Sequence, residues 1–169
     1  MASSVLRDDA ALRSPPLGEA GTRVDAELEL TVPATCAALP TLRLVSETFL
    51  AAELARVQAD DLLPDVLLAL HEATANVVRH AYRGAPEPGP LTLRLEISPW
   101  LLRITVADAG PGYDFDTVPP PDFAHPRDGG YGLHLMRATM SRLSYVRRPG
   151  RNVLVLEKAL RTPRRERAA

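Results

Sequence analysis

The stretch of sequence that decides the fold is HEATANVVRHAY, residues 71–82. Glu72, Asn76 and His80 are four residues apart, so on a helix they line the same side. A carboxylate followed one turn later by a carboxamide suits Mg²⁺, because this ion takes few protein oxygens and keeps its waters and substrate phosphates. The carboxylate of Glu72 can also take a proton from an attacking hydroxyl group. The same spacing is compatible with a solvated helix face on which His80 is a packing residue.

This stretch belongs to a helix that we expect from about residue 62 to residue 82. Pro64 falls in the first turn of this helix, where a missing N–H costs little. The core-facing positions at helical spacing are Val66, Leu67, Leu70, Ala73 and Val77. A preceding helix is expected from about residue 38 to residue 57, with apolar positions at Leu42, Val45, Phe49, Ala52 and Leu54.

Segments in which polar and apolar residues alternate predict strands around these helices. They are residues 26–32, 91–97 and 102–106. Residues 91–97 and 102–106 form a hairpin with one buried face. Residues 142–147 and 152–158 form a second hairpin around Pro149-Gly150, and a short helix is expected over residues 132–141. The order β-α-α-β-β-loop-α-β-β predicts an α+β fold: a two-layer sandwich of a mostly antiparallel sheet with helices on one face.

A second chemistry-bearing segment follows the third predicted strand directly. It contains Asp108, Gly110 and Gly112 at alternate positions. An aspartate at a strand end can accept a hydrogen bond from an exocyclic amine, and glycines let the backbone approach a ligand closely. Ordinary turns after strands use the same residue types, so this segment alone does not separate a binding site from a turn.

A third segment, residues 129–132, is glycine-rich and opens the short helix. Gly130 and Gly132 lie where free N–H groups at a helix N-terminus bind phosphate. The segment is neither a Walker A sequence nor a dinucleotide-binding fingerprint, because no Gly-Lys-Ser/Thr follows and no strand immediately precedes it. A flexible loop before a helix is the alternative interpretation.

Composition restricts the classes of function. The chain has 169 residues, enough for one compact domain, and a formal net charge of −1, which does not indicate a nucleic-acid or anionic-membrane partner. The single cysteine, Cys36, excludes an intramolecular disulfide and favours a reducing, cytoplasmic location. No apolar run approaches the roughly 20 residues of a membrane span, so we expect no membrane partner.

Domain boundaries follow from changes in composition along the chain. Residues 1–24 lack periodicity and are expected to be a disordered extension, and residues 25–160 to form the domain. Residues 161–169 are a basic tail, which we interpret as solvated and not as a nucleic-acid-binding arm. The long segment from Gly110 to Gly130 is rich in proline and glycine, and stretches of this kind are usually functional or mobile.

The three segments together, in this order and spacing, resemble the N, G1 and G2 boxes of the gyrase/histidine kinase/MutL ATPase superfamily. The His80-Ala81-Tyr82 ending and the small size are similar to bacterial anti-sigma factor serine/threonine kinases. The resemblance covers roughly residues 26–160. It implies the histidine-kinase-like ATPase fold, with ATP and Mg²⁺ as cofactors.

The resemblance also implies roles for the residues on the long helix. Asn76 would coordinate the Mg²⁺ that bridges the ATP phosphates. Glu72 would be the catalytic base, and Arg79, on the turn after Asn76, would reach a phosphate.

The resemblance also implies roles for the residues of the two glycine-containing segments. Asp108 would accept from the adenine amino group, and Gly110 and Gly112 would shape the base pocket. Gly130 and Gly132 would cradle phosphates. The proline-rich loop between Gly112 and Gly129 would be a lid that closes over the nucleotide.

The function that the resemblance implies is an ATP-dependent serine/threonine kinase and anti-sigma factor of a partner-switching system. It would phosphorylate a STAS-domain anti-sigma antagonist and otherwise sequester a sigma factor. Relatives are often dimers, so a homodimer is a further expectation. The alternative is a catalytically weak or inactive ATP-binding module that regulates a partner by sequestration.

Two other features bear on these interpretations. A histidine-kinase fragment would need a phosphoacceptor histidine ahead of the ATPase domain, but all histidines (His71, His80, His125 and His134) fall inside the expected domain. The chain also departs from the family at two places. Ser141 follows Met140 where relatives often have an acidic residue, and Asn152 ends the last glycine turn where Gly-Thr is frequent. Neither departure removes a predicted metal or adenine contact.

Overall fold

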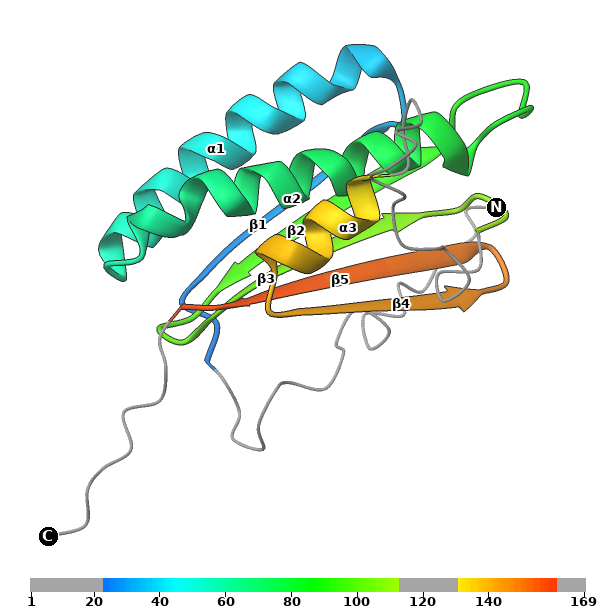
Figure 1. Cartoon of the computed structure of the whole chain (residues 1–169). Coiled ribbons are helices and arrows are strands. Elements are labelled where there is room, and N and C mark those ends of the chain that lie inside the picture. The colour runs from blue at the N-terminus through cyan, green and yellow to red at the C-terminus, as the bar shows by residue number, and fades with distance from the viewer. Residues whose placement is uncertain (1–22, 113–130, 161–169) are drawn as a thin grey trace, which may run out of the picture.

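The computed structural model describes residues 23–112 and 131–160, and these form an α+β two-layer sandwich (Figure 1). The strands are β1 (Ala26–Pro33), β2 (Pro90–Ile97), β3 (Leu101–Asp108), β4 (Arg142–Arg148) and β5 (Arg151–Ala159). The helices are α1 (Leu39–Arg56), α2 (Leu63–Asn76) and α3 (Gly132–Thr139), with short helical turns η2 (Cys36–Ala38), η3 (Asp60–Leu62) and η4 (Val77–Ala81). The predicted order of elements is confirmed.

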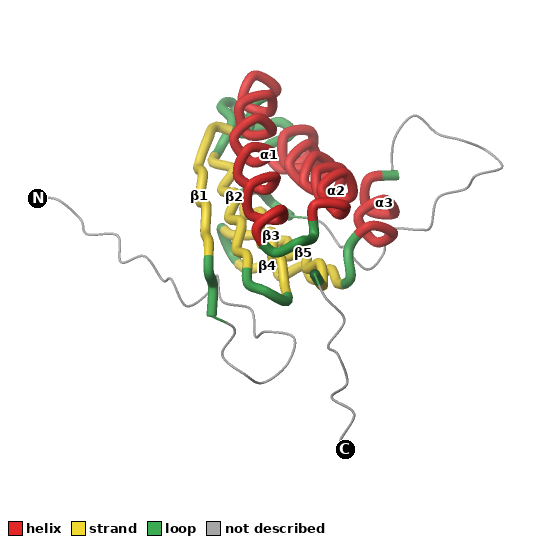
Figure 2. The backbone as a smooth tube through the Cα atoms, turned by 90° about the vertical axis from the view of Figure 1, so that its left-hand side faces the viewer, coloured by secondary structure: helices red, strands yellow, loops and turns green. Residues whose placement is uncertain are grey.

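The sheet has the strand order β1-β2-β3-β5-β4, and every neighbouring pair is antiparallel. All three α-helices cover one face of this sheet, as the end-on view in Figure 2 shows. The predicted fold class is therefore confirmed. Because β5 lies between β3 and β4, residues Asp108 at the end of β3 and Asn152 at the start of β5 are register partners.

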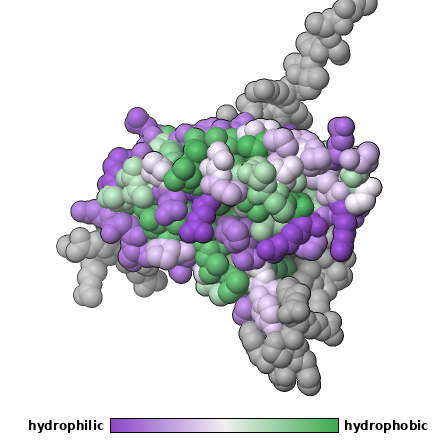
Figure 3. Space-filling view, turned by 90° about the horizontal axis from the view of Figure 1, so that it is seen from above, coloured by the Kyte–Doolittle hydropathy of each residue, from purple (hydrophilic) through white to green (hydrophobic). Residues whose placement is uncertain are grey.

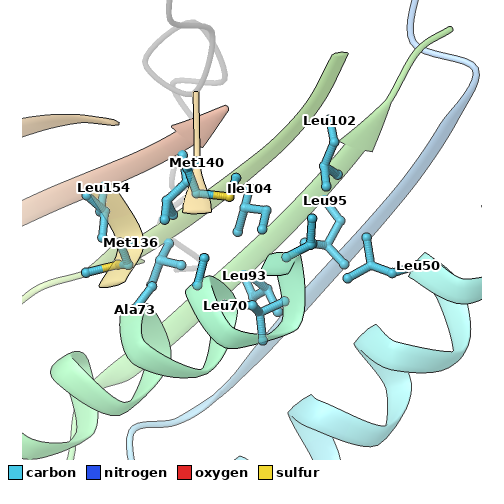
Figure 4. Close-up of a cluster of buried hydrophobic side chains, with 14 of the residues drawn as sticks. Leu50, Leu70, Ala73, Leu93, Leu95, Leu102, Ile104, Met136, Met140 and Leu154 are labelled. Carbon is cyan, nitrogen blue, oxygen red and sulfur yellow. The ribbon is translucent and has the colours of Figure 1, made fainter. Parts of the chain in front are cut away.

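The core lies between the sheet and the helices. Leu93 and Leu95 of β2 and Ile104 of β3 point from the sheet toward Leu70 of α2 and Leu50 of α1, and all five are almost completely buried (Figure 4). Full burial of a leucine side chain contributes roughly 1.5–3 kcal/mol. The alternation predicted for β2 and β3 thus holds the helix layer on the sheet.

The predicted core face of α1 is partly wrong. The buried residues of α1 are Leu42, Ser46, Leu50 and Leu54, which repeat every four residues. Val45 and Phe49 are only half-buried, and Ala52 is exposed. Apolar residues lie around most of this helix, so their spacing does not single out one face. The contact with the sheet decides which face is buried.

The predicted helix over residues 62–82 is shorter than expected as an α-helix. It is α-helical from Leu63 to Asn76 and continues as a π-helical turn, η4, from Val77 to Ala81. Val77 remains buried across the change. Apolar spacing does not distinguish the two helix types over one turn. Single π-helical turns inside α-helices are frequent at functional sites.

The sheet face opposite the helices is also partly buried, in contrast to the one buried face predicted for the hairpin of β2 and β3. Ala107 of β3 and Val153 and Val155 of β5 form a second small cluster there. Thr105 is only 1% exposed on the same face. Charged pairs occupy the other end of this face, where Arg103 donates to Glu157 at 2.8 Å.

The helix side of the molecule exposes a mixture of hydrophilic and hydrophobic residues (Figure 3). Leu44 of α1 and Leu68 of α2 are its large exposed apolar side chains among the described helices. No helix of the described residues has the length and apolar character needed to cross a bilayer. The predicted N-terminal extension up to residue 22, the basic tail, and most of the proline-rich loop including Gly130 lie outside the described residues.

Candidate functional site

A cavity of about 810 Å³ opens between α2, η4, α3 and the sheet. Its volume lies within the range of small-molecule and cofactor sites. The lining residues come from three segments that are far apart in the sequence, within residues 72–81, 106–112 and 131–135, and from one residue each of β4 and β5. They are Glu72, Ala73, Asn76, Val77, Arg79, His80, Ala81, Val106, Asp108, Gly112, Tyr131, Gly132, Leu133, Leu135, Tyr145 and Leu154.

The α2 wall of the cavity carries the polar residues predicted from the helix spacing. Glu72, Asn76 and His80 all line the cavity, together with Arg79. Glu72 and Asn76 are half-buried, and their side chains make no hydrogen bond or ion pair with another described residue. A carboxylate and a carboxamide without partners in the described part of the chain are thus available to a ligand.

The α3 wall approaches Glu72 closely because residue 132 is a glycine. A Cβ atom at Gly132 would lie 2.6 Å from Glu72 Oε2 and 3.5 Å from Asn76 Nδ2. Gly132 is also the first residue of α3, and the first N–H groups of a helix have no partner within that helix, so this helix N-terminus lies near the Glu72 carboxylate. The absence of a side chain therefore brings a helix N-terminus next to the polar face of α2.

Asp108 lies at the sheet end of the cavity. Its Oδ1 accepts from the Gly110 N–H at 2.9 Å and from Asn152 Nδ2 at 2.8 Å. Asn152 Nδ2 also donates to the Gly110 carbonyl at 2.9 Å. Among the described residues, nothing donates to Asp108 Oδ2, so this acceptor is available to a ligand.

The two glycines after Asp108 have different surroundings. Gly112 lines the cavity with φ of +73°, and a Cβ there would lie 2.6 Å from Asn152 Oδ1. Gly110 does not line the cavity. It lies against the backbone carbonyl of Ala81, which a Cβ at this position would overlap. Gly112 thus shapes the cavity wall, whereas Gly110 allows the end of η4 and the end of β3 to touch.

Tyr82 is a structural residue of this region for which the sequence suggested no role. Its hydroxyl donates to the Pro90 carbonyl at 2.6 Å and accepts from the Ala109 N–H at 2.8 Å. Its ring fills the space that a side chain at Gly89 would occupy. Burial raises the pKa of Tyr82, the Asp108 charge adds to the rise, and the Ala109 hydrogen bond opposes it.

Asn152 was also missed as part of the site, although it is one of the two departures from the family pattern. It is 1% exposed and contacts both Asp108 and Gly110. The signal that could have found it is its place two residues after the β4–β5 turn glycine, directly before a run of four buried apolar residues, Val153 to Leu156.

The floor of the cavity between its polar ends is apolar. It is formed by Val106 and Leu154 of the sheet, with Leu133 of α3 and Tyr145 of β4 beside them. Such a floor suits a planar ring, because stacking on it excludes water. The predicted positions Glu72, Asn76, Arg79, Asp108, Gly112 and Gly132 thus share one cavity, while Gly110 lies behind its wall and Gly130 lies outside the described residues.

The polar groups of the cavity limit the metal chemistry it can support. No group of three or more His, Cys, Asp or Glu suited to a metal ion occurs in the described part of the chain. Glu72 and Asn76 supply only two oxygen-bearing side chains. This donor set fits Mg²⁺, which is typically held by one or two protein groups together with substrate phosphates and water.

Comparison with known proteins agrees with this geometry. The family model of the histidine kinase-like ATPase domain matches residues 32–158. The chain belongs to this family. The match includes every described residue that lines the cavity, all of β2, β3 and β4, and β5 up to Lys158, but only the last two residues of β1.

Within the family, this ATPase domain is similar to the serine-protein kinase RsbW of Staphylococcus aureus. The two are 29% identical over 134 residues, which cover 73% of this chain and 80% of the relative. RsbW of the strain bovine RF122 / ET3-1 is 28% identical over the same length.

Among solved structures, the ATPase domain is similar to the crystal structure of the RsbU and RsbW domains of Rv1364c from Mycobacterium tuberculosis. The TM-score is 0.54 at 22% identity, and the match covers 79% of this chain and 31% of that chain. This likeness confirms the fold.

Proposed function

We propose that this ATPase domain is an ATP-binding serine/threonine protein kinase and anti-sigma factor of a partner-switching system. Its substrate would be a STAS-domain anti-sigma antagonist. The observation that carries the proposal is one cavity that joins an unpartnered carboxylate and carboxamide on α2, a helix N-terminus at Gly132 and an acceptor at Asp108. The similarity to proteins named serine-protein kinase supports it.

The two ends of the cavity suit the two ends of ATP. Asp108 Oδ2 would accept from the adenine amino group, and the base would lie on the apolar floor. The N-terminus of α3 at Gly132, with Arg79 across the cavity, would hold phosphate oxygens. Asn76 would be the protein ligand of Mg²⁺, which when bound neutralises charge on the phosphates.

Glu72 is the residue that we assign as catalytic base. Its carboxylate lies beside Gly132, next to the predicted phosphate site. There it would accept the proton of the attacking serine or threonine hydroxyl. Phosphoryl transfer needs little covalent help from the protein, so positioning and charge neutralisation would supply most of the catalysis.

The partners follow from the proposed activity. A STAS-domain antagonist would present its hydroxyl at the open side of the cavity, and a sigma factor would be the protein sequestered when the antagonist is phosphorylated. We place this exchange in the cytoplasm and include a homodimer as the working assembly. No direct contact with nucleic acid or membrane is part of the proposal.

The test is phosphoryl transfer from radiolabelled ATP to a STAS-domain protein of the same organism. Label on the STAS protein with wild type, and its loss with Glu72→Gln at unchanged ATP affinity, are the expected results. ATP binding without any transfer would replace the kinase assignment by the sequestering module. Failure of wild type to bind Mg-ATP would overturn both.

A further inference from the structure

We infer that Asn152 is a positioning residue for base recognition: it holds the Asp108 carboxylate so that a single oxygen, Oδ2, faces the ligand. The inference rests on the proposed ATP binding and specifies how the base end of that site achieves selectivity. Asn152 itself does not line the cavity, whereas Asp108 does. An effect of Asn152 on a bound base therefore acts through the cavity residues that it contacts, and Asp108 is the one of these to which it donates a hydrogen bond.

The orientation of the Asn152 amide is determined by its partners. Nδ2 lies 2.8 Å from Asp108 Oδ1 and 2.9 Å from the Gly110 carbonyl oxygen. Both partners are acceptors, so the reversed amide would place its oxygen against a carboxylate and a carbonyl. Asn152 is also the register partner of Asp108 in the adjacent strand, which fixes the distance between the two side chains.

These contacts make the two oxygens of Asp108 inequivalent. Oδ1 receives two donors, Asn152 Nδ2 and the Gly110 N–H. Oδ2 receives none from the described residues. A base that presents an amino group at this point provides the missing donor, while a base with a carbonyl there meets an acceptor. The arrangement favours a 6-aminopurine over a 6-oxopurine.

The remaining atom of the amide supports a role in orientation over a role in packing. Asn152 Oδ1 is buried and has no hydrogen-bond partner among the described residues. It lies against Gly112, where a Cβ would be only 2.6 Å away. A leucine has the same number of side-chain heavy atoms, branched at the same position, and carries no buried unpartnered acceptor. The two donated bonds are what the amide supplies that an apolar residue cannot.

The experiment compares two ligands and two proteins. Binding of Mg-ATP and of Mg-purine riboside triphosphate, which has hydrogen in place of the 6-amino group, is measured by calorimetry for wild type and Asn152→Leu. We expect wild type to prefer ATP by about tenfold or more, since hydrogen bonds to charged groups are the stronger ones. Asn152→Leu should lose about tenfold in ATP affinity and less than about threefold for the analogue, so the preference collapses.

Controls separate positioning from general structural damage. Thr105→Val is the matched variant, because Thr105 is also 1% exposed with an unpartnered hydroxyl but lies on the other face of the sheet. It should keep the ATP preference. In the kinase assay Asn152→Leu should raise KM for ATP with kcat changed less than about twofold. If Asn152→Leu does not fold, Asn152→Ser, which is smaller and retains one donor, should show a smaller collapse.

The outcomes distinguish this inference from the proposed function. If wild type does not bind Mg-ATP, the proposed function fails. Suppose instead that wild type binds ATP, and that Asn152→Leu lowers the affinity for both ligands equally or changes neither affinity. Asn152 then does not position Asp108 for the base, and the inference is overturned.

Discussion

The Tyr82 hydroxyl accepts the Ala109 N–H at 2.8 Å and donates to the Pro90 carbonyl at 2.6 Å. Tyr82 directly follows η4, Ala109 directly follows β3, and Pro90 is the first residue of β2. The Tyr82 side chain therefore connects the end of η4 to both strands. Asp108 directly precedes Ala109, and Asn76 directly precedes η4. The tie therefore fixes the α2 wall of the cavity relative to the sheet wall.

The first prediction tests this tie. Tyr82→Phe removes both hydrogen bonds and keeps the ring against Gly89. Because both backbone partners are at exposed residues that water can reach, the unfolding free energy should fall by about 1 kcal/mol. Urea denaturation at neutral pH measures this unfolding free energy. The affinity for Mg-ATP should also fall by several-fold. An unchanged midpoint with unchanged affinity would show that the tie has no energetic role.

The raised pKa of Tyr82 predicts a pH dependence of stability. Burial and the Asp108 charge raise the pKa in the folded state above the ordinary value of about 10. The associated stability is therefore fully present below about pH 10 and is lost as the pH rises through the folded-state pKa. Wild type should lose more unfolding free energy than Tyr82→Phe as the pH is raised above about 9. Parallel losses in the two proteins would contradict this.

The metal-binding assignment predicts the behaviour of Asn76→Ala. At a nucleotide concentration about 100 times Kd, Mg-ATP should stabilise wild type by about 2.7 kcal/mol, a rise in Tm on the order of 5–10 °C. The variant should lose this rise, while its Tm without nucleotide stays close to that of wild type because Asn76 has no described hydrogen-bond partner. Retention of the nucleotide-induced shift would remove Asn76 from the site.

The assignment of Glu72 as base predicts a separation of binding from turnover. Glu72→Gln should bind Mg-ATP within a few-fold of wild type and lose about 10²–10⁴-fold in phosphoryl transfer. Glu47→Gln is the matched control, since Glu47 lies on α1 and does not line the cavity. Transfer at the wild-type rate by Glu72→Gln would exclude the base role.

The close approach of α3 to Glu72 predicts different effects at two glycines. In Gly132→Ala the new Cβ meets the end of the Glu72 side chain, which can rotate away, so turnover should fall at least tenfold with little loss of stability. In Gly110→Ala the obstacle is the Ala81 backbone, so stability should fall by several kcal/mol. Thermal melts and the kinase assay separate the two. Equal loss of stability in both would contradict the description of the α2–α3 contact.

Much of the fold and one wall of the site followed from local sequence patterns. Alternation in β2 and β3 predicted which residues face the helices, because successive strand residues point to opposite faces. Glu72 and Asn76 were identifiable because residues four apart on a helix share a side. The core face of α1 could not be identified from the sequence, because apolar residues lie around most of this helix. Only contact with the sheet selects the buried residues Leu42, Ser46, Leu50 and Leu54.

The sequence by itself determined the order of elements, the antiparallel sheet with its helix layer, and the residue types available for chemistry. The tertiary structure alone decided which residues support Asp108. Asn152 and Asp108 are 44 residues apart, and Tyr82 and Ala109 are 27 apart, so no local period relates them. Insertion of β5 beside β3 and contact of η4 with the end of β3 bring these groups within hydrogen-bonding distance. Such contacts depend on strand order and register, which only the folded chain establishes.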